Sequence, residues 1–481
     1  MMRGADVLAR SLAAAGAPHL FALSGNHVMP VFDAALDAKL SIIHVRHEAA
    51  AAHMADAWGR LTGQPGVALV TGGPGHANAV SALYTALAAE SPMLLISGHA
   101  ALDELGKGAF QEMRQADVAA PLAKGSWTVR SVEALAQDVV RAWRLAISGR
   151  PGPVHLSVPN DVLDAATDSP IASAFKVESP SFRLPPELKE AKRPLIIAGP
   201  AAMRKKAQCG IPLIGMESPR GVNDPSLGRL AEVLKKADAV LLAGKQLDFT
   251  LRFGKAFAED CRIFECEGMP SDAVRGNDSW RAEVEAALSY RPTEWRAISG
   301  RSHPVAVCRE VQKLLDSPDA VLVSDGGEFG QWAQACLAAP HRVINGPAGS
   351  IGSALPFAAA AKLALPHSRV VAMLGDGTFG FHMSEIDTAV RYGLDYVAVV
   401  GNDATWNAEY QIQLRAYGEA RAKGCELLPT RYGAVAAAMG AHGEDVVSFN
   451  QLGEALGRAA AAGKPACVNV MIERVAAPKY A

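Results

Sequence analysis

The sequence predicts an α/β protein built from three doubly wound parallel-sheet domains. Short β-branched runs alternate with alanine-rich helical stretches along the whole chain, which is the pattern of repeated strand–helix units. The strand-like runs are apolar throughout, as expected where helices cover both faces of a parallel sheet. With 481 residues, the chain is long enough for about three domains of ordinary size.

The predicted strands are short apolar runs, and most are separated by segments of helical length. Two polar breaks divide the series: residues 159–192, rich in proline, serine and aspartate, and a weaker one at 290–303. We therefore predict domains at residues 1–165, 187–295 (shortened) and 300–481, the first and third alike in architecture. The strands are expected at residues 41–45, 66–71, 93–97, 154–158, 195–198, 239–242, 320–324, 370–374, 396–400 and 467–472.

Composition excludes several classes of protein. A net charge of −2 and a pI of about 6.7, without a basic stripe, argue against a nucleic-acid partner. No apolar run approaches the ~20 residues that span a membrane, and the first residues do not resemble a signal peptide. The seven cysteines form no CxxC pair and are expected to be reduced. We expect a cytoplasmic protein that acts on a small molecule.

The stretch LGDGTFGFHMSEIDTAVRYGLDYVAVVGNDATWNAE, which begins at Leu374, is the most informative in the chain. Asp376 and Asp403 follow two neighbouring predicted strands, and carboxyl ends of parallel strands are where α/β sheets build ligand sites. Gly377 and Thr378 would let a diphosphate approach closely, after which we expect a loop and a helix capped at Ser384. The two carboxylates and the carbonyl of Thr405 would hold a divalent cation. A lone GDG turn is common, so the pairing carries the prediction.

These paired turns resemble the thiamine diphosphate enzyme superfamily, whose motif is GDG followed downstream by NN. Here Asp403 replaces the second asparagine, which adds a negative charge and remains compatible with Mg²⁺. The segment NGPAGSIGSAL resembles the family's glycine-rich stretch, in which Ile351 would support the bent cofactor and the Gly349 carbonyl would accept from its aminopyrimidine. An ordinary glycine-rich helix entry is the alternative. Gly327 and Glu328 lie in a candidate diphosphate loop.

The first domain carries the complementary motif. The run RHEAAAAHMADAWGR resembles the family segment whose acid activates the cofactor, and Glu48 occupies that position. This chemistry needs a carboxylic acid in an apolar pocket, whereas a glutamate at a helix start is otherwise a common dipole partner. The run TGGPGHAN resembles the turn that places Gly73, Pro74 and Asn78 against the pyrimidine. Because the two halves of the motif lie on different domains, the resemblance implies a homodimer or homotetramer with the cofactor at the subunit interface.

The whole chain is similar to the group of acetolactate synthase, benzaldehyde lyase, oxalyl-CoA decarboxylase and 2-hydroxyacyl-CoA lyase. The run GAFQEM resembles a segment of that group in which a glutamine, here Gln111, faces the reacting carbon beside Phe110. The run SGNH resembles the segment where benzaldehyde lyase carries an active-site histidine, so that Asn26 would line the pocket and His27 would transfer a proton. A surface-loop histidine is the alternative.

Two further residues extend this site. Trp406 would shape the pocket, and Glu409 lies where pyruvate decarboxylase-like enzymes place an acid near the leaving carboxylate. A solvated helix-face glutamate is equally compatible with the sequence. The segment KQLDFT at residues 245–250 favours the hydroxyacyl-CoA lyase type.

The resemblance implies a thiamine diphosphate- and Mg²⁺-dependent C–C lyase, carboligase or decarboxylase. Its substrate would be a 2-keto acid, a 2-hydroxy ketone or a 2-hydroxyacyl compound. The alternatives are an FAD-containing acetolactate synthase and a catalytically silent cofactor-binding protein. The short middle domain shows no dinucleotide loop, so FAD is not expected. Glu48 together with the Asp376–Asp403 pair argues against a silent binder, which would not need the activating acid.

Overall fold

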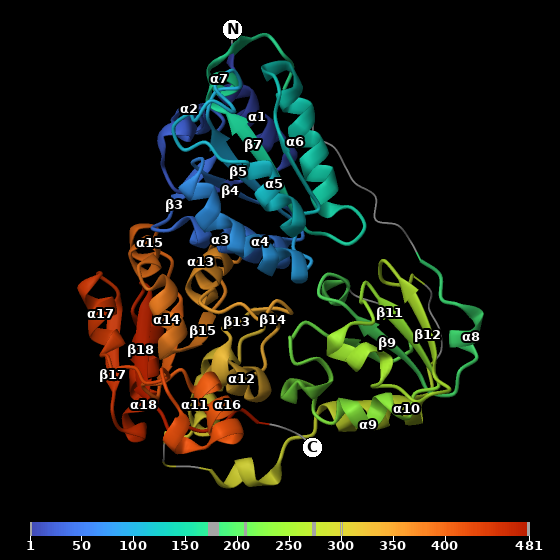
Figure 1. Ribbon diagram of the computed structural model, residues 1–481. Coiled ribbons are helices and arrows are strands. Elements are labelled where there is room, and N and C mark those ends of the chain that lie inside the picture. Colours follow the sequence, from blue (N-terminus) through green and yellow to red (C-terminus); the bar gives the residue numbers. More distant parts are fainter. Residues whose placement is uncertain are drawn as a thin grey trace. The chain divides into compact units, whose positions relative to one another are not determined.

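The computed structural model describes residues 2–171, 182–205, 209–271, 276–298, 300 and 302–478, and shows three parallel sheets flanked by helices (Figure 1). Contacts divide the chain into two compact units, Met1–Ser179 with Ala359–Ala364, and Pro180–Ala358 with Leu365–Ala481. The α/β class with three doubly wound sheets is confirmed. The three domain boundaries stay a prediction, and the proposed linker at 159–192 lies partly outside the described residues.

The first unit contains a six-stranded sheet of order β3-β2-β4-β5-β7-β6, in which all pairs are parallel. A short antiparallel pair, β1 with β8, lies apart from it. The elements are β1 (Met2–Arg3), α1 (Gly4–Ala15), β2 (His19–Ala22), η1 (Asn26–Val28), α2 (Met29–Asp37), β3 (Ser41–His44), α3 (Glu48–Thr62), β4 (Gly66–Val70), α4 (Pro74–Ala88), β5 (Met93–His99), α5 (Gln115–Ala119), η2 (Ala120–Leu122), β6 (Gly125–Thr128), α6 (Val132–Ile147), β7 (Pro153–Pro159), α7 (Asn160–Asp164) and β8 (Ala166–Thr167).

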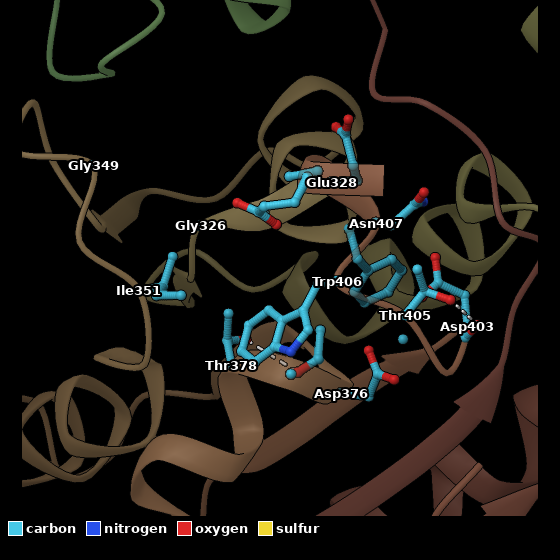
Figure 2. A pocket seen from close by; sticks show the side chains of 17 residues that line it. Gly326, Glu328, Gly349, Ile351, Asp376, Thr378, Asp403, Thr405, Trp406 and Asn407 are labelled. Atoms are coloured by element: carbon cyan, nitrogen blue, oxygen red, sulfur yellow. Dashed lines mark hydrogen bonds between the residues drawn. The ribbon is translucent and has the colours of Figure 1, made fainter. Parts of the chain in front are cut away.

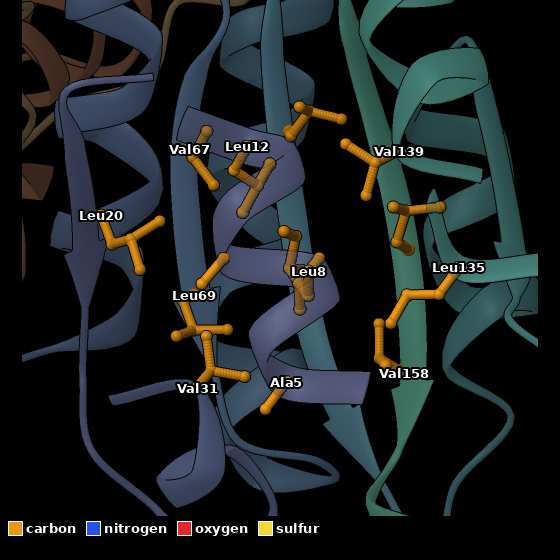
Figure 3. Close-up of a cluster of buried hydrophobic side chains, with 14 of the residues drawn as sticks. Ala5, Leu8, Leu12, Leu20, Val31, Val67, Leu69, Leu135, Val139 and Val158 are labelled. Carbon is orange, nitrogen blue, oxygen red and sulfur yellow. The ribbon is translucent and has the colours of Figure 1, made fainter. Parts of the chain in front are cut away.

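Helical periodicity explains the core on one face of this sheet (Figure 3). Leu8 and Leu12 lie one turn apart on α1, and Leu135 and Val139 do so on α6. All four are fully buried against sheet residues such as Leu69. Each such side chain contributes about 1.5–3 kcal/mol of burial free energy.

Helix α3 covers part of the sheet with small side chains. Its buried residues include four consecutive alanines that follow Glu48, and His47 caps its start by accepting a hydrogen bond from the Ala49 N–H at 3.1 Å. A Cβ added at Gly59 would lie 2.2 Å from the Pro92 carbonyl oxygen. The alanines and glycine of this motif therefore allow neighbouring elements to pack closely around Glu48.

The second unit contains a four-stranded sheet of order β10-β9-β11-β12 and a six-stranded sheet of order β14-β13-β15-β16-β18-β17, both parallel. The first has α8 (Pro186–Lys189), β9 (Pro194–Ala198), η3 (Ala202–Arg204), β10 (Leu213–Gly215), η4 (Gly221–Asn223), η5 (Pro225–Leu227), α9 (Leu230–Leu234), β11 (Ala239–Ala243), η6 (Phe249–Gly254), β12 (Arg262–Cys266), α10 (Asp278–Leu288) and η7 (Thr293–Ala297). The second has α11 (Pro304–Leu315), β13 (Val321–Ser324), α12 (Gly327–Cys336), β14 (His341–Ile344), α13 (Ala354–Ala364), β15 (Val370–Gly375), α14 (Asp376–His382), α15 (Glu385–Arg391), β16 (Val397–Asn402), α16 (Asn407–Tyr417), η8 (Glu419–Arg421), α17 (Tyr432–Ala438), β17 (His442–Val446), η9 (Phe449–Gln451), α18 (Leu452–Ala461) and β18 (Ala466–Met471).

Both six-stranded sheets share one topology, because their strands, numbered in chain order within each sheet, run 2-1-3-4-6-5. This confirms the predicted likeness of the first and third parts of the chain. In the four-stranded sheet, alternate residues of β11 enter two separate hydrophobic clusters, with Val240 and Leu242 on one face and Leu241 and Ala243 on the other. Coverage of both faces explains why β11 is apolar at every position.

All ten predicted strands are present, and no end differs by more than two residues. The strands that the sequence did not predict include β6, β10, β12, β14 and β17, which lie at sheet edges and are shorter or more polar. The expected loop after Asp376 was wrong, because α14 begins at Asp376 itself. The expected cap was also wrong: Ser384 precedes α15 but its side chain makes no capping hydrogen bond.

Among the residues that the structure describes, no helix is both long and apolar enough to cross a membrane. No disulfide joins the seven cysteines, all of which lie in described positions.

Candidate functional site

A cavity of about 180 Å³ lies at the carboxyl end of the sheet formed by β13–β18 (Figure 2). Its walls come from the turns that follow β13, β15 and β16 and from the glycine-rich segment before α13. The structure thus brings together every site residue predicted in the last part of the chain: Gly327, Glu328, Gly349, Ile351, Asp376, Gly377, Thr378, Asp403, Thr405, Trp406 and Glu409. Their individual roles stay predictions.

Sheet topology explains this convergence. The chain leaves β13 towards β14 on one side and reaches β15 on the other side, so the turns after β13 and β15 diverge and leave a crevice between them. Gly326 and Gly327 follow β13, Asp376 directly follows β15, and Asp403 directly follows β16. Residues from distant parts of the sequence therefore meet at one edge.

Asp376 is the most deeply buried carboxylate of the cavity wall, at 2% exposure. Its Oδ2 atom is buried and has no hydrogen-bond partner in the structure. Burial raises the pKa of Asp376 to about 6, although backbone N–H groups of Gly377, Thr405 and Ala404 act in the opposite direction. An unpartnered buried carboxylate oxygen is costly unless a cation or another donor satisfies it.

Asp403 lies close enough to Asp376 for their charges to repel. Burial and the Asp376 charge raise the pKa of Asp403 to about 7, and Arg474 offsets part of this effect. Figure 2 shows Asp376, Asp403 and Thr405 together at one end of the cavity. Two carboxylates that disfavour each other's charge form a suitable site for a divalent cation, which relieves both the repulsion and the burial.

The described residues contain no group of three or more His, Cys, Asp or Glu side chains that could hold a metal. A cation between Asp376 and Asp403 would therefore need backbone carbonyl, phosphate or water oxygens to complete its shell. That combination is typical of Mg²⁺, which keeps few protein ligands. The donor set thus fits Mg²⁺ bound together with a diphosphate.

The floor of the cavity is shaped by an aromatic contact. A Cβ added at Gly377 would lie 2.6 Å from the ring of Trp406, so only glycine fits there. Trp406 in turn meets Phe381 in an edge-to-face contact at 6.2 Å between ring centroids. The GDG turn and Trp406 are consequently one packed unit.

The opposite wall is formed by glycine-rich backbone. Gly327, the first residue of α12, has φ +78°, and nothing lies within 4 Å of an added Cβ. This open start of a ten-residue helix offers backbone N–H groups of the kind that bind phosphate. Glu328 accepts a hydrogen bond from the Ala477 N–H at 3.0 Å, and Glu409 lines the cavity with an exposed side chain.

In the first unit, Glu48 is buried at the start of α3. Asn78 donates from Nδ2 to Glu48 Oε2 at 3.0 Å, and a Cβ added at Gly75 would lie 3.3 Å from Oε1. The RHE motif and the TGGPGHAN turn, predicted separately from the sequence, are therefore in direct contact. Gly73 and Pro74 form the start of α4 in that turn.

His27 is also buried, so the surface-loop alternative is wrong for this residue. Its Nδ1 lies 3.1 Å from Thr71 Oγ1, and its ring stacks on Phe110 at 6.2 Å between centroids. Burial lowers the pKa of His27 below its usual value, while a hydrogen bond with the Phe110 backbone acts to raise it. A neutral imidazole near neutral pH suits proton transfer. Asn26 beside it is exposed, and Phe110 is 68% exposed.

Gln111 adopts a left-handed backbone conformation with φ +57°, which is strained for a non-glycine residue. Its backbone packs on the turn after β4, because a Cβ at Gly73 would lie 2.6 Å from the Gln111 carbonyl oxygen. This contact holds Gln111 at the same strand ends as His27. Such strain is often found where a side chain must be placed for function.

Three buried residues of these sites were not predicted from the sequence. Gln115, at 1% exposure, accepts from the Gly73 N–H at 2.8 Å and donates to the Gly98 carbonyl oxygen at 3.0 Å. Asp325 and His382 hold the glycine-rich wall of the cavity. Their partners in these contacts are distant in sequence, so no local pattern indicated them; the one signal was the place of Asp325 at the start of the candidate diphosphate loop, residues 325–328.

The side chains of the segment KQLDFT contact one another. Lys245 Nζ lies 2.6 Å from Asp248 Oδ2, and Asp248 Oδ1 accepts from the N–H of Thr250 at 2.9 Å. Asp248 thereby caps η6, and Lys245 neutralises it. These contacts give the segment a structural role.

Comparison with known proteins agrees with this geometry. Residues 2–118 match the family described as "Thiamine pyrophosphate enzyme, N-terminal TPP binding domain", and residues 325–470 match its "C-terminal TPP binding domain". A probable acetolactate synthase of Mycobacterium bovis is 32% identical over 98% of this chain and 96% of its own length. The 2-hydroxyacyl-CoA lyase 2 of Danio rerio is 30% identical over 98% of this chain and 91% of its own, and that of Mus musculus is 30% identical over 92% and 84%.

Proposed function

The chain belongs to the family of thiamine pyrophosphate (thiamine diphosphate) enzymes, and from that premise we propose that it is an Mg²⁺-dependent C–C lyase, carboligase or decarboxylase. The substrate would be a 2-keto acid, a 2-hydroxy ketone or a 2-hydroxyacyl compound. The observation that carries the proposal is the pair of buried Asp376 and half-buried Asp403 on one cavity wall. A bound cation would offset the repulsion between the two carboxylates and satisfy the unpartnered Oδ2 of Asp376. The same cation would neutralise a bound diphosphate.

The residues of this cavity would hold the diphosphate end of the cofactor. Asp376 and Asp403 would bind Mg²⁺ with the Thr405 carbonyl, while backbone at Gly377 and Gly327 would face the phosphates. Ile351 and Gly349 line the same cavity and would contact the rest of the cofactor. When bound, thiamine diphosphate supplies a nucleophilic carbon and an electron sink for cleaving or forming a bond beside a carbonyl.

Glu48 would hold a proton at the N1′ position of the aminopyrimidine. Its buried position at the start of α3, followed by four alanines, supports this role. Asn78 donates to the carboxyl group and fixes its orientation. A protein that only bound the cofactor would not need this acid, so the silent-binder alternative is not favoured.

His27, Gln111 and Glu409 are the candidates for handling protons of the substrate. Buried His27, held by Thr71 and stacked on Phe110, is best placed to act as a neutral acid–base group. Gln111 could donate a hydrogen bond from its strained position, and Glu409 lies on the wall of the second unit's cavity. Phe110 and Trp406 would shape the substrate pocket.

The relatives support two substrate classes. Some are named acetolactate synthases and others 2-hydroxyacyl-CoA lyases, at nearly equal identity. Their alignments are longer than this chain, which fits the predicted shortening of the middle domain. The absence of FAD, the homo-oligomeric state and the cytoplasmic location stay predictions; a flavin absorbance band in the purified protein would favour the acetolactate synthase alternative.

The decisive experiment is a turnover panel of pyruvate, benzoylformate, glyoxylate, benzoin, oxalyl-CoA and a 2-hydroxyacyl-CoA, with thiamine diphosphate and Mg²⁺. We expect one class to react, and Glu48→Gln to lower its kcat by about 100-fold or more because the acid is lost. Cofactor affinity should change far less. The exposed Glu104→Gln is the matched control. Undetectable cofactor binding by the wild-type protein would refute the proposal.

A further inference from the structure

Two loops of the second unit's cavity are far apart in sequence. One follows β13 and contains Gly326 and Gly327, and the other, with Gly349 and Ile351, precedes α13. Because both loops line the cavity, the distance between them sets its width. The residue that joins them is Asp325, the last residue before the first loop.

Asp325 is fully buried, and backbone N–H groups from both loops donate to its carboxylate. Oδ1 accepts from Gly326 at 2.8 Å and from Gly352 at 2.8 Å, and Oδ2 accepts from Ala354 at 3.0 Å. The second and third donors lie 27 and 29 residues further along the chain. One side chain thus ties the first loop to the second.

The two loops are also packed without spare room. A Cβ added at Gly326 would lie 2.7 Å from Ile351 Cγ2 and 3.0 Å from Asn345 Nδ2. Asn345 itself donates to the Ser350 carbonyl oxygen at 3.0 Å. The position of Ile351 in the cavity wall therefore depends on how closely the first loop approaches.

Helix α14, which also contributes to the cavity, contacts the second loop at Gly352. His382, the last residue of α14, places Nδ1 2.7 Å from the carbonyl oxygen of Gly352, whose N–H is bound by Asp325. Helix α14 begins with Asp376. Gly352 is therefore held on both sides, by Asp325 at its N–H and by the end of α14 at its carbonyl oxygen, while Asp376 lies at the other end of that helix.

Burying a carboxylate costs several kcal/mol unless hydrogen bonds compensate it, and here backbone N–H groups do so. An apolar side chain at this position could fill the space but could not hold three donors from two loops. The hydrogen bonds that offset the cost of burying Asp325 are therefore the same ones that connect the two cavity walls.

We propose that Asp325 is a positioning residue for cofactor binding, which sets the separation of the Gly327 loop from the Gly349–Ile351 loop. This inference rests on the proposed function, since the ligand it concerns is thiamine diphosphate. Asp325 does not line the cavity, and it acts through the backbone of both loops. Its loss alters the fit of the cofactor and leaves the carboxylates Asp376 and Asp403 in place.

The test compares Asp325→Asn with Asp238→Asn in the cofactor-free protein and in its complex. Asp238 is the matched control because its carboxylate also accepts two backbone N–H groups, from Lys192 and Arg193, and it does not line the cavity. Calorimetry measures the affinity for thiamine diphosphate at saturating Mg²⁺ and for Mg²⁺ alone. Hydrogen–deuterium exchange of the cofactor-free protein follows the two loops directly.

For Asp325→Asn we expect thiamine diphosphate affinity to fall about 10- to 100-fold, as for other residues that orient ligand-binding groups. Affinity for Mg²⁺ alone should change less than about twofold, because its carboxylates are untouched. Exchange should rise in both loops together. The Asp238→Asn protein should match the wild type in all three measurements.

Unchanged thiamine diphosphate affinity with faster loop exchange, or equal losses of cofactor and Mg²⁺ affinity, would overturn the proposal and leave Asp325 a purely structural residue. If Asp325→Asn does not fold, Gly326→Ala decides, because its new methyl group separates the same loops while the carboxylate stays. Wild-type protein that binds no thiamine diphosphate would instead refute the proposed function.

Discussion

Asp376 and Asp403 show how burial and charge prepare a single site for a cation. Burial raises the pKa of both carboxyl groups well above the usual value of about 3.8, and the charge of Asp376 raises the pKa of Asp403 further. The asparagine of the family motif carries no charge and would remove this repulsion. Asp403 therefore adds a second titrating carboxylate, so cation binding should depend more strongly on pH than it would with asparagine at this position.

This residue-scale effect predicts the pH dependence of Mg²⁺ binding. Protons compete with the cation for a carboxylate below its pKa, so apparent affinity should fall as pH drops through about 7 and faster below about 6. The loss approaches about tenfold per pH unit for each proton displaced. Calorimetric titrations of the cofactor-free protein between about pH 8 and 5.5 measure it.

The substitution Asp403→Asn distinguishes the contributions of the two carboxylates to this pH dependence. Its amide oxygen remains a ligand but does not titrate, so the decline that begins near pH 7 should disappear and only a later one, due to Asp376, should remain. The exposed Asp260→Asn should behave as the wild type. Identical pH profiles of the wild type and Asp403→Asn would show that Asp403 does not bind the cation.

Helix α3 illustrates a constraint at the scale of elements. It carries Glu48 at its start, and seven of its fifteen residues are alanine or glycine. Gly59 lies in the last turn of the helix, where a Cβ would meet the Pro92 carbonyl oxygen. Glycine in a helix is normally unfavourable by about 0.5–1 kcal/mol, so this contact explains its presence.

Gly59→Ala should therefore destabilise the protein by about 1–3 kcal/mol, because the methyl group has no space. Gly457→Ala is the matched control: Gly457 is exposed in the middle of α18, and nothing lies within 4 Å of its added Cβ. That substitution should stabilise the protein by about 0.4–1 kcal/mol. Chemical denaturation of both variants measures the difference, and equal effects would contradict the packing argument.

The strands also show how far prediction reaches at this scale. Interior strands such as β11, and β16 up to its final Asn402, lack polar side chains and were predicted closely, because helices cover both faces. Edge strands such as β12 and β17 carry charged residues and half-buried positions, so they lack that pattern. Short β2 was missed although it lies inside its sheet, since four residues give too little pattern.

For the whole molecule, the resemblance implies that one cofactor is held by Glu48 of one subunit and Asp376 of another. Mixing inactive Glu48→Gln and Asp376→Asn subunits tests this. After subunit exchange, a dimer with shared sites regains one intact site per mixed pair, or roughly a quarter of wild-type activity under random mixing. Sites within single subunits would regain none.

Light scattering of the separate and mixed variants provides the control, because both must assemble like the wild type for the result to count. A monomer at the concentrations assayed would contradict the predicted homo-oligomer. Recovery of activity without assembly would contradict the shared-site explanation.

The sequence by itself determined the α/β class, the interior strands and the motif turns that contain Glu48, Asp376 and Asp403. These features are local, since periodicity and spacing express burial and turn chemistry within a few residues. Only the tertiary structure decided that His27 is buried against Thr71, that α14 starts at Asp376, and that Asp325 and Gln115 hold the loops. The hydrogen bonds concerned join a side chain to a group 27 to 44 residues away, which sheet topology brings together and no local pattern indicates.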